Sequence, residues 1–196
     1  MHRQTFNVGD IVYVDNKMQK GYSYRLVAER GAPTANFDPA FTPNAMLRLG
    51  VFGSVYMRDC LNEYPAEMSN GMRCQYSHNT QQAEMNAFKV LSGDNLAFWR
   101  AAGWIDPQDP RGWFEWYCRY WLGRRTQDDY RQMARWRMFA PRHAGTIRAF
   151  GKRDITVRQK TRQSLLHWAS DPVPDFTCLP GECIAQKTFR VIEEEG

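Results

Sequence analysis

The chain has no apolar run near the roughly 18 residues that a transmembrane helix needs, so we expect no membrane partner. No charged segment followed by an apolar stretch opens the sequence, which argues against a secretory signal and predicts an intracellular location. The sequence also lacks a P-loop and the GxGxxG, HExxH, GxSxG and DFG-like motifs. Their absence excludes the best-known nucleotide-binding, metalloprotease, hydrolase and kinase signatures, and we expect no cofactor.

Cysteine and histidine give little support for a metal site. The five cysteines are an odd number, which favours a reducing compartment. Cys178 and Cys183 flank a Leu-Pro-Gly-Glu turn, but no CxxC pair and no two histidines at i, i+4 complete a zinc site. We expect unpaired turn cysteines or a local disulfide there rather than a metal.

What the chain does contain is typical of a folded protein. Its 196 residues are 43% apolar and 24% charged, which excludes collagen-like and fully disordered chains. That length suits one domain, or one domain with a small appendage. Aromatic residues reach 14%, including 7 Trp, so we expect an unusually aromatic core.

Positive charge is concentrated in one part of the chain. Residues 111–162 hold 12 Arg and 2 Lys against 4 acids, a net charge of +10, whereas the remainder has a net charge of −5. Such an asymmetry favours a polyanionic partner, the phosphate backbone of DNA or RNA. The alternative is an arginine-rich helical surface that is simply solvated.

The pattern predicts a mainly α protein, a single helical domain preceded by an N-terminal β-hairpin. We expect a hairpin and loop arm over 1–41, a helical domain over 42–171 and a tail over 172–196, with a strand at 187–192. Caps, glycines and prolines predict helices over 44–49, 55–61, 95–102, 110–122, 126–139 and 142–150, and a last one that Asp154 or Thr156 caps and that runs to Ala169. The predicted N-caps of the helices over 95–102, 110–122 and 126–139 are Asp94, Asp109 and Thr126. Thr126 forms a predicted capping box with Asp129.

Residues 111–125 are the most distinctive stretch. On a helix, Trp113, Trp116, Tyr117 and Tyr120 share one face, so we expect most of these rings to pack in the core. Gly123 then lets the chain turn, and Arg124 and Arg125 follow it directly. Planar guanidinium groups near a helix start suit phosphate oxygens.

Candidate phosphate-binding residues follow from this reading, on the assumption that three helices bring them to one face. They are Arg111, Arg124, Arg125, Arg131, Arg135, Arg158 and Arg162. Trp121 and Tyr130 are the candidates for stacking on bases.

Candidate catalytic residues are fewer. Asp59, Asp109 and His167 are the weak candidates for an acid or a base. Asp109 has a simpler interpretation as a helix N-cap, and His167 as a histidine at the surface or the core edge.

Three blocks of sequence together resemble a widespread family of uncharacterised small proteins. They are Met46–Gly53 with Tyr56, Asp59 and Cys60, then Trp99–Ile105 with Asp109–Tyr120 and Gly123–Arg125, then Arg162–Ala169. The resemblance spans Tyr22 to Asp171 and implies membership but no activity. A weaker similarity links the chain to helical domains of phage enzymes that hypermodify thymine in DNA, through Leu49–Gly53 as a helix-hairpin-helix turn.

Three functions therefore remain open. The first is a nucleic-acid-binding helical protein with an arginine-rich, phosphate-binding face. The second is an enzyme acting on a modified base or a phosphorylated nucleotide in DNA. The third is a structural subunit of a larger ribonucleoprotein or organellar assembly, with the hairpin and the tail as partner arms.

Overall fold

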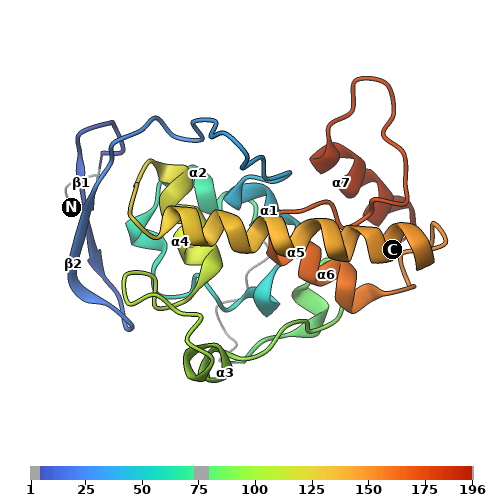
Figure 1. The fold of residues 1–196 in the computed structure, drawn as a ribbon, viewed down its shortest axis with the longest axis horizontal. Helices are drawn as coiled ribbons and strands as arrows, with labels where there is room; N and C mark the ends of the chain where they lie inside the picture. The colour runs from blue at the N-terminus through green and yellow to red at the C-terminus, as the bar shows by residue number, and fades with distance from the viewer. Residues whose placement is uncertain (1–4, 73–79, 196) are drawn as a thin grey trace. The chain divides into compact units, whose positions relative to one another are not determined.

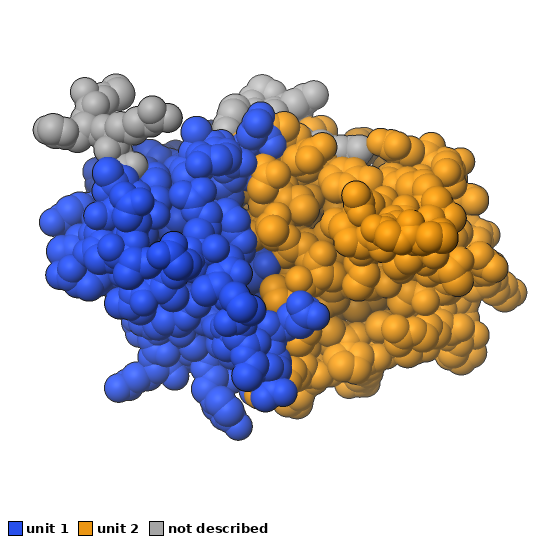
Figure 2. Space-filling view, turned by 90° about the horizontal axis from the view of Figure 1, so that it is seen from above, with its two compact units in different colours: residues 1–38, 57–70, 94–134 blue, residues 39–56, 71–93, 135–196 orange. Residues whose placement is uncertain are grey.

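The computed structural model describes residues 5–72 and 80–195, which form two compact units. Unit 1 comprises residues 1–38, 57–70 and 94–134, and unit 2 comprises residues 39–56, 71–93 and 135–196 (Figure 2). Both units are assembled from segments that are distant in the chain. This grouping runs across the expected segments 1–41, 42–171 and 172–196, because long-range contacts rather than sequence order define each unit.

Unit 1 begins with the expected β-hairpin. Strand β1 (Ile11–Asp15) pairs antiparallel with β2 (Lys20–Arg25), and Val12 lies opposite Tyr24 (Figure 1). Burial alternates along β1, because successive side chains of a strand point to opposite faces. The side chain of Asn16 closes the turn by accepting hydrogen bonds from two backbone N–H groups.

The rest of unit 1 is helical and is centred on α4. Its elements are η2 (Leu61–Glu63), α2 (Ala66–Ser69), α3 (Leu96–Ala101), α4 (Trp113–Leu122) and the start of α5 (Asp129–Phe150). Every residue from 111 to 120 is buried, so the aromatic stretch forms the core of this unit as expected. The ring of Phe37, from the chain after the hairpin, packs edge-on against Trp116, Tyr117 and Tyr120.

Unit 2 is helical throughout its regular elements. They are α1 (Pro43–Leu49), η1 (Phe52–Ser54), η3 (Ala83–Met85), the remainder of α5, α6 (Gln159–His167) and α7 (Ile184–Glu195). The end of α6 lies beside α5: the indole of Trp136 donates to the carbonyl of Trp168, and Phe139 stacks on the Trp168 ring (Figure 1). Leu165, Leu166 and Ile147 are fully buried in this core.

The architecture confirms the expected fold class, mainly α with an N-terminal hairpin. Thr42 caps α1 by accepting a hydrogen bond from the backbone N–H of Ala45, and Pro43 occupies the first helical position. At the start of α5 the carboxylate of Asp129 accepts hydrogen bonds from the backbone N–H and the hydroxyl of Thr126, which is one half of a capping box.

Several predicted elements are wrong. The predicted helix over 55–61 is absent: residues 56–60 form turns, because Gly53 and Ser54 have positive φ angles and the chain changes direction there, and Leu61 already belongs to η2. Pro141 does not end a helix, since α5 runs through it with the proline on its exposed side. The tail forms helix α7 instead of a strand over 187–192, and it buries Lys187, Thr188 and Val191 on one face.

Three predicted caps are also wrong. Asn95 rather than Asp94 caps α3, by accepting from the N–H of Phe98. Helix α4 starts after Gly112, so Asp109 is not its N-cap. Helix α6 starts after Arg158, whose side chain makes no capping bond, while Asp154 accepts hydrogen bonds from Thr156 in the preceding turn.

Within the described part of the chain, none of the helices is both long enough and apolar enough to cross a membrane. Helix α5 has sufficient length, but it carries arginines at several positions.

Candidate functional site

Arg119 on α4 is completely buried in unit 1 and is surrounded by carboxylates. Its Nε and Nη2 atoms bind the two oxygens of Glu63 at 2.6 and 3.0 Å, and Nη1 lies 3.1 Å from Asp109. The rings of Tyr22 and Tyr24 cover the guanidinium at 5.3 and 5.6 Å. The arginine therefore fastens the hairpin to α4.

Arg124 shares this buried network. Its Nη2 atom lies 2.6 Å from the second oxygen of Asp109, and its Nη1 atom donates to the hydroxyl of Tyr22. Burial raises the pKa of Asp109, while Arg124 and Arg119 act in the opposite direction. Asp109 is thus a bridge between two arginines rather than the helix cap that its position suggested.

Arg111 extends the network towards the surface. Its Nη2 atom lies 3.0 Å from Asp59, and its backbone N–H donates to Glu115. Burial raises the pKa of Glu115 to about 7, so this carboxyl is partly protonated at neutral pH. The three arginines therefore face four carboxyl groups of the same unit, those of Asp59, Glu63, Asp109 and Glu115.

The network therefore keeps Arg111 and Arg124 inside unit 1. Their side chains are 9% and 1% exposed, and each guanidinium is bound to an acid of the same chain. Asp59 and Asp109 are likewise engaged with these arginines. These four residues bind one another within unit 1, and they lie outside our proposal for ligand binding.

The remaining candidates of unit 1 have mixed surroundings. Arg125 stacks on the ring of Tyr120 at 3.8 Å and donates to two backbone carbonyls. Arg131 is paired with Asp128, with 2.8 Å between Nη2 and Oδ2. Trp121 is half-buried beside Arg30, whereas Tyr130 is 76% exposed.

His167 is a core residue of unit 2. Its ring stacks on Phe52 at 4.2 Å, and its Nε2 atom accepts a hydrogen bond from the backbone N–H of Phe52. Burial lowers the pKa of the imidazole to about 3. His167 is consequently neutral at physiological pH and supports the turn after α1.

Arg162 on α6 is a buried positioning residue in unit 2. Its two terminal nitrogens bind the carboxylate of Asp175 at 2.8 and 2.7 Å. The same guanidinium donates to the carbonyls of Asp154, Val157 and Pro172. It thereby ties the loop between α5 and α6 to the chain that follows α6.

The loop is also packed tightly at Gly151. A Cβ atom at this position would lie 2.4 Å from the Asp175 carboxylate and 2.8 Å from Arg162 Nη2. The carboxylate of Asp175 accepts from the backbone N–H of Arg153 as well. Gly151, Arg162 and Asp175 therefore form a pin that fixes the backbone of residues 151–158.

This pin presents a group of exposed cations, which we call the basic loop surface. It consists of Arg148, Lys152, Arg153, Arg158 and Lys160. None of the five forms an ion pair with a carboxylate of the described residues. Asp154 is the only acid between residues 142 and 160, and its side chain is bonded to Thr156.

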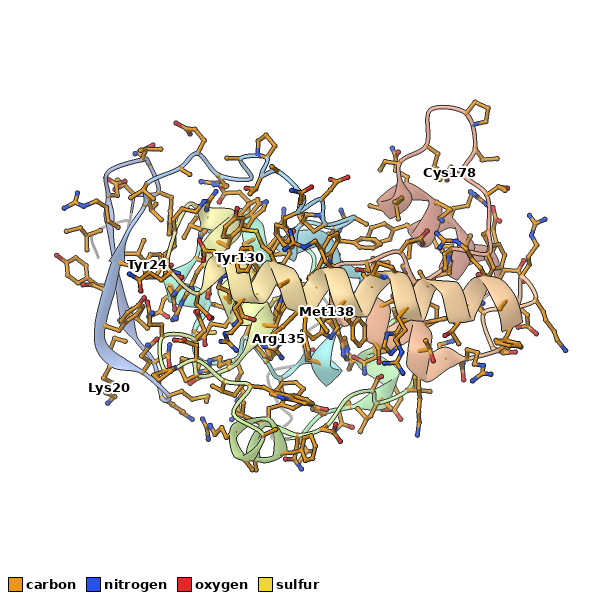
Figure 3. The ribbon with its side chains drawn as sticks, in the orientation of Figure 1. Lys20, Tyr24, Tyr130, Arg135, Met138 and Cys178 are labelled. Carbon is orange, nitrogen blue, oxygen red and sulfur yellow. The ribbon has the colours of Figure 1, made fainter. Side chains whose placement is uncertain are left out.

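Phe150 lies beside this surface, whereas the predicted phosphate ligand Arg135 lies elsewhere in unit 2. The guanidinium of Arg158 lies 5.4 Å from the ring of Phe150, which is 56% exposed at the end of α5. Arg135 leaves α5 on the side of α6, and its guanidinium lies 5.4 Å from the Trp168 ring (Figure 3). Of the seven predicted phosphate ligands, Arg158 is the one that belongs to the basic loop surface.

Sequence reasoning missed four of the five cations of this surface and also Phe150. The available signal was the charge of residues 142–160, which hold six cations and one acid. The i, i+4 spacing of Arg158 and Arg162 suggested a shared face, but the first is exposed and the second is buried. Spacing alone could not reveal Asp175 as the partner of Arg162.

The glycine turn after α1 does not offer free N–H groups to a phosphate. The N–H of Gly53 donates to Asn86, and that of Phe52 donates to His167. A Cβ atom on Gly50 would lie 2.2 Å from the carbonyl oxygen of Met85. This turn is buried against residues 81–87, unlike an exposed helix-hairpin-helix turn.

Cysteine chemistry adds no site in the described residues. Cys178 and Cys183 are free and exposed, whereas Cys60 and Cys118 are free and buried. Cys178 lies on the loop before α7 (Figure 3), and Cys74 is outside the described residues. No group of three or more His, Cys, Asp or Glu side chains in the described residues is placed to hold a metal ion.

Comparison with known proteins gives no match, either to protein-family models or to curated proteins or to solved structures. The two resemblances noted in the sequence therefore stay predictions.

Proposed function

We propose that this protein binds the phosphate backbone of nucleic acid through the basic loop surface of unit 2. The observation that carries the proposal is that five exposed cations between Arg148 and Lys160 lack carboxylate partners among the described residues. The chain neutralises its buried arginines with its own acids, so unpaired cations gathered in one short segment stand apart from the rest.

Charge and chemistry both support phosphate as the ligand. Guanidinium groups donate two parallel hydrogen bonds to phosphate oxygens, and lysines add flexible positive charge. Five cations within residues 148–160 raise the local potential of this segment, because surface charges closer than a Debye length, about 8 Å at physiological salt, act together. Binding then gains from the release of counterions held by the nucleic acid.

Rigidity of the loop is a second support. The pin of Gly151, Arg162 and Asp175 fixes the backbone that carries Lys152, Arg153 and Arg158. A preorganised surface loses less conformational freedom when it binds than a flexible one does. Arg162 thus contributes to binding through its effect on the loop and not by touching the ligand.

No specific contact favours the enzymatic alternative. Asp59 and Asp109 are bound to arginines, and His167 is buried with its Nε2 atom engaged by a backbone N–H. A role as a subunit of a larger assembly is compatible with phosphate binding and stays a prediction.

Fluorescence anisotropy tests the proposal with labelled 20-nucleotide strands and a 20-base-pair duplex at low salt. The decisive variant combines Arg148→Glu, Lys152→Glu and Arg158→Glu, which reverses three charges of the basic loop surface. A charge-matched control combines Lys17→Glu, Lys20→Glu and Arg100→Glu, three exposed cations of unit 1. We expect the first variant to lose affinity by at least about 100-fold and the control to lose far less.

Two results would overturn the proposal. One is an absence of binding by the native protein at low salt. The other is an equal loss in both variants, which would show that net charge rather than this surface determines affinity. Circular dichroism of both variants checks that each is folded.

A further inference from the structure

We infer that the basic loop surface takes single-stranded nucleic acid and stacks one base on Phe150. This inference rests on the proposed function, because it names the class of nucleic acid that the same surface would bind. Its own support is an exposed aromatic ring placed among the phosphate-binding cations.

Phe150 is the last residue of α5 and directly precedes the pinned loop. It is 56% exposed although a phenylalanine side chain is usually buried. The guanidinium of Arg158 lies 5.4 Å from the centre of its ring. One side of the ring therefore faces a cation of the surface, while more than half of the residue remains accessible to a ligand.

The ring and the cations are held together by the same contacts. Gly151, the next residue, donates its N–H to the carbonyl of Ile147 at the end of α5, and its Cα is packed against Asp175 and Arg162. Lys152 and Arg153 follow directly. The backbone of Phe150 is at most about 7 Å from that of Lys152 and about 11 Å from that of Arg153, so a base on Phe150 and a phosphate bound by these cations can belong to neighbouring nucleotides.

Single strands fit this arrangement better than duplexes do. A duplex keeps the faces of its bases stacked on one another, so only base edges and phosphates are accessible in its grooves. A single strand exposes base faces, and aromatic side chains between cations are the usual means of binding it without sequence preference. The short row of cations suits a few nucleotides rather than a long duplex face.

Phe98, another exposed phenylalanine, lacks this combination. Phe98 in unit 1 is 49% exposed and packs edge-on against Trp104, with 5.7 Å between the ring centres. Arg100 is the one cation among residues 94–106 of that segment, which also holds Asp94 and Asp106. Phe98 therefore provides a matched control, since it is a similarly exposed phenylalanine outside the basic loop surface.

The test measures affinity for labelled 8-nucleotide oligothymidylate, 8-nucleotide oligouridylate and a 20-base-pair duplex. Phe150→Ala should weaken binding of the single strands by about 5- to 150-fold, the range observed for loss of one stacked base. Phe150→Tyr should restore it to within about 3-fold, because tyrosine keeps the aromatic face. Phe98→Ala should leave the affinity for all three probes unchanged. The two oligonucleotides distinguish DNA from RNA as the preferred strand.

Each outcome separates this inference from the proposed function. If Phe150→Ala binds single strands like the native protein while the triple glutamate variant does not, phosphate binding stands and base stacking is wrong. If Phe150→Ala weakens the duplex as much as the single strands, the preference for single strands is wrong. If the native protein binds none of the three probes, both proposals fail.

Discussion

Arg119 is a fully buried charged residue of unit 1 with three acidic neighbours. It is completely buried and lies within ion-pair distance of Glu63, Asp109 and Glu115. Removing one member of a buried ion pair leaves its partners charged and desolvated, which costs about 3–5 kcal/mol. We expect Arg119→Met to lower the free energy of unfolding by that amount in urea denaturation.

An exposed arginine supplies the control for this prediction. Arg142 is exposed on α5, and Arg142→Met should change the free energy of unfolding by less than about 0.5 kcal/mol. Equal effects of the two substitutions would contradict the assignment of Arg119 to a buried structural network.

His167 makes a prediction about pH. An unfolded histidine has a pKa of about 6.5, whereas burial lowers the pKa of His167 in the folded protein to about 3. Between these values the unfolded state binds the proton and the folded state does not. The contribution of His167 to stability is therefore complete above pH of about 6.5 and declines as the pH falls, by about 1.4 kcal/mol per pH unit.

The variant His167→Gln isolates this contribution, because the other titrating groups are the same in both proteins. We expect the native protein to be more stable than the variant at pH 7.5, and this difference to shrink steadily between pH 6 and pH 4. Urea denaturation at each pH measures it. A difference that stays constant across that range would show that His167 is not a buried neutral residue.

At the scale of single residues, the sequence could locate charged and aromatic positions but not their surroundings. The i, i+4 pair Glu115 and Arg119 looks like the polar face of a helix, yet both residues are buried because the hairpin covers them. Their other partners, such as Glu63, come from distant segments. Burial of an arginine depends on such tertiary contacts, which local patterns do not contain.

Helix α5 gives a prediction at the scale of the element. Pro141 lies inside this helix of 22 residues and is exposed, so the chain loses one backbone hydrogen bond there without burying the ring. Pro141→Ala restores the backbone N–H donor and places a residue of high helix propensity at this position. We expect thermal denaturation to show a rise in stability of about 1–3 kcal/mol. An unchanged or lower melting temperature would mean that the proline suits the helix at this position.

The loop between α5 and α6 gives a second prediction. Gly151→Ala would place a Cβ atom 2.4 Å from Asp175 Oδ2 and 2.7 Å from the carbonyl oxygen of Ile147. Relief of such contacts requires a backbone shift, which costs about 1–3 kcal/mol. Urea denaturation should show this loss, and anisotropy should show weaker binding of oligothymidylate.

Gly145→Ala is the matched control, because a Cβ atom there meets nothing within 4 Å. This substitution sits on the exposed side of α5 and should be neutral or slightly stabilising. If Gly151→Ala behaved like Gly145→Ala in both assays, the loop would not depend on the pin.

The secondary-structure predictions were correct where turn residues and helix caps act locally. The hairpin and α1 were predictable because turn residues and the Thr42-Pro43 cap act locally. The prediction of a strand over 187–192 is wrong. These residues lie in α7, which buries Lys187 and Val191 on one face of the helix. Pro141 predicts a helix end from its missing N–H, but α5 continues through it with the proline exposed.

On the scale of the whole molecule, the sequence shows which segment carries the excess positive charge, but it does not show which of these cations are exposed. Residues 111–162 carry a net charge of +10, yet Arg111, Arg119, Arg124 and Arg162 are buried against carboxylates from other segments. Both units hold part of that stretch. Five of the exposed cations of this stretch lie within residues 148–160, and only the structure distinguishes them from the buried arginines.

The salt dependence of oligothymidylate binding, compared between the native protein and the triple glutamate variant, tests the central claim most directly. Five cations that contact phosphates predict a plot of log affinity against log salt with a slope of about −2 to −3.5 for a single strand. The variant with Arg148→Glu, Lys152→Glu and Arg158→Glu should bind weakly, with a much shallower slope. A native slope near zero, or the same slope in both proteins, would contradict the basic loop surface as the phosphate-binding site.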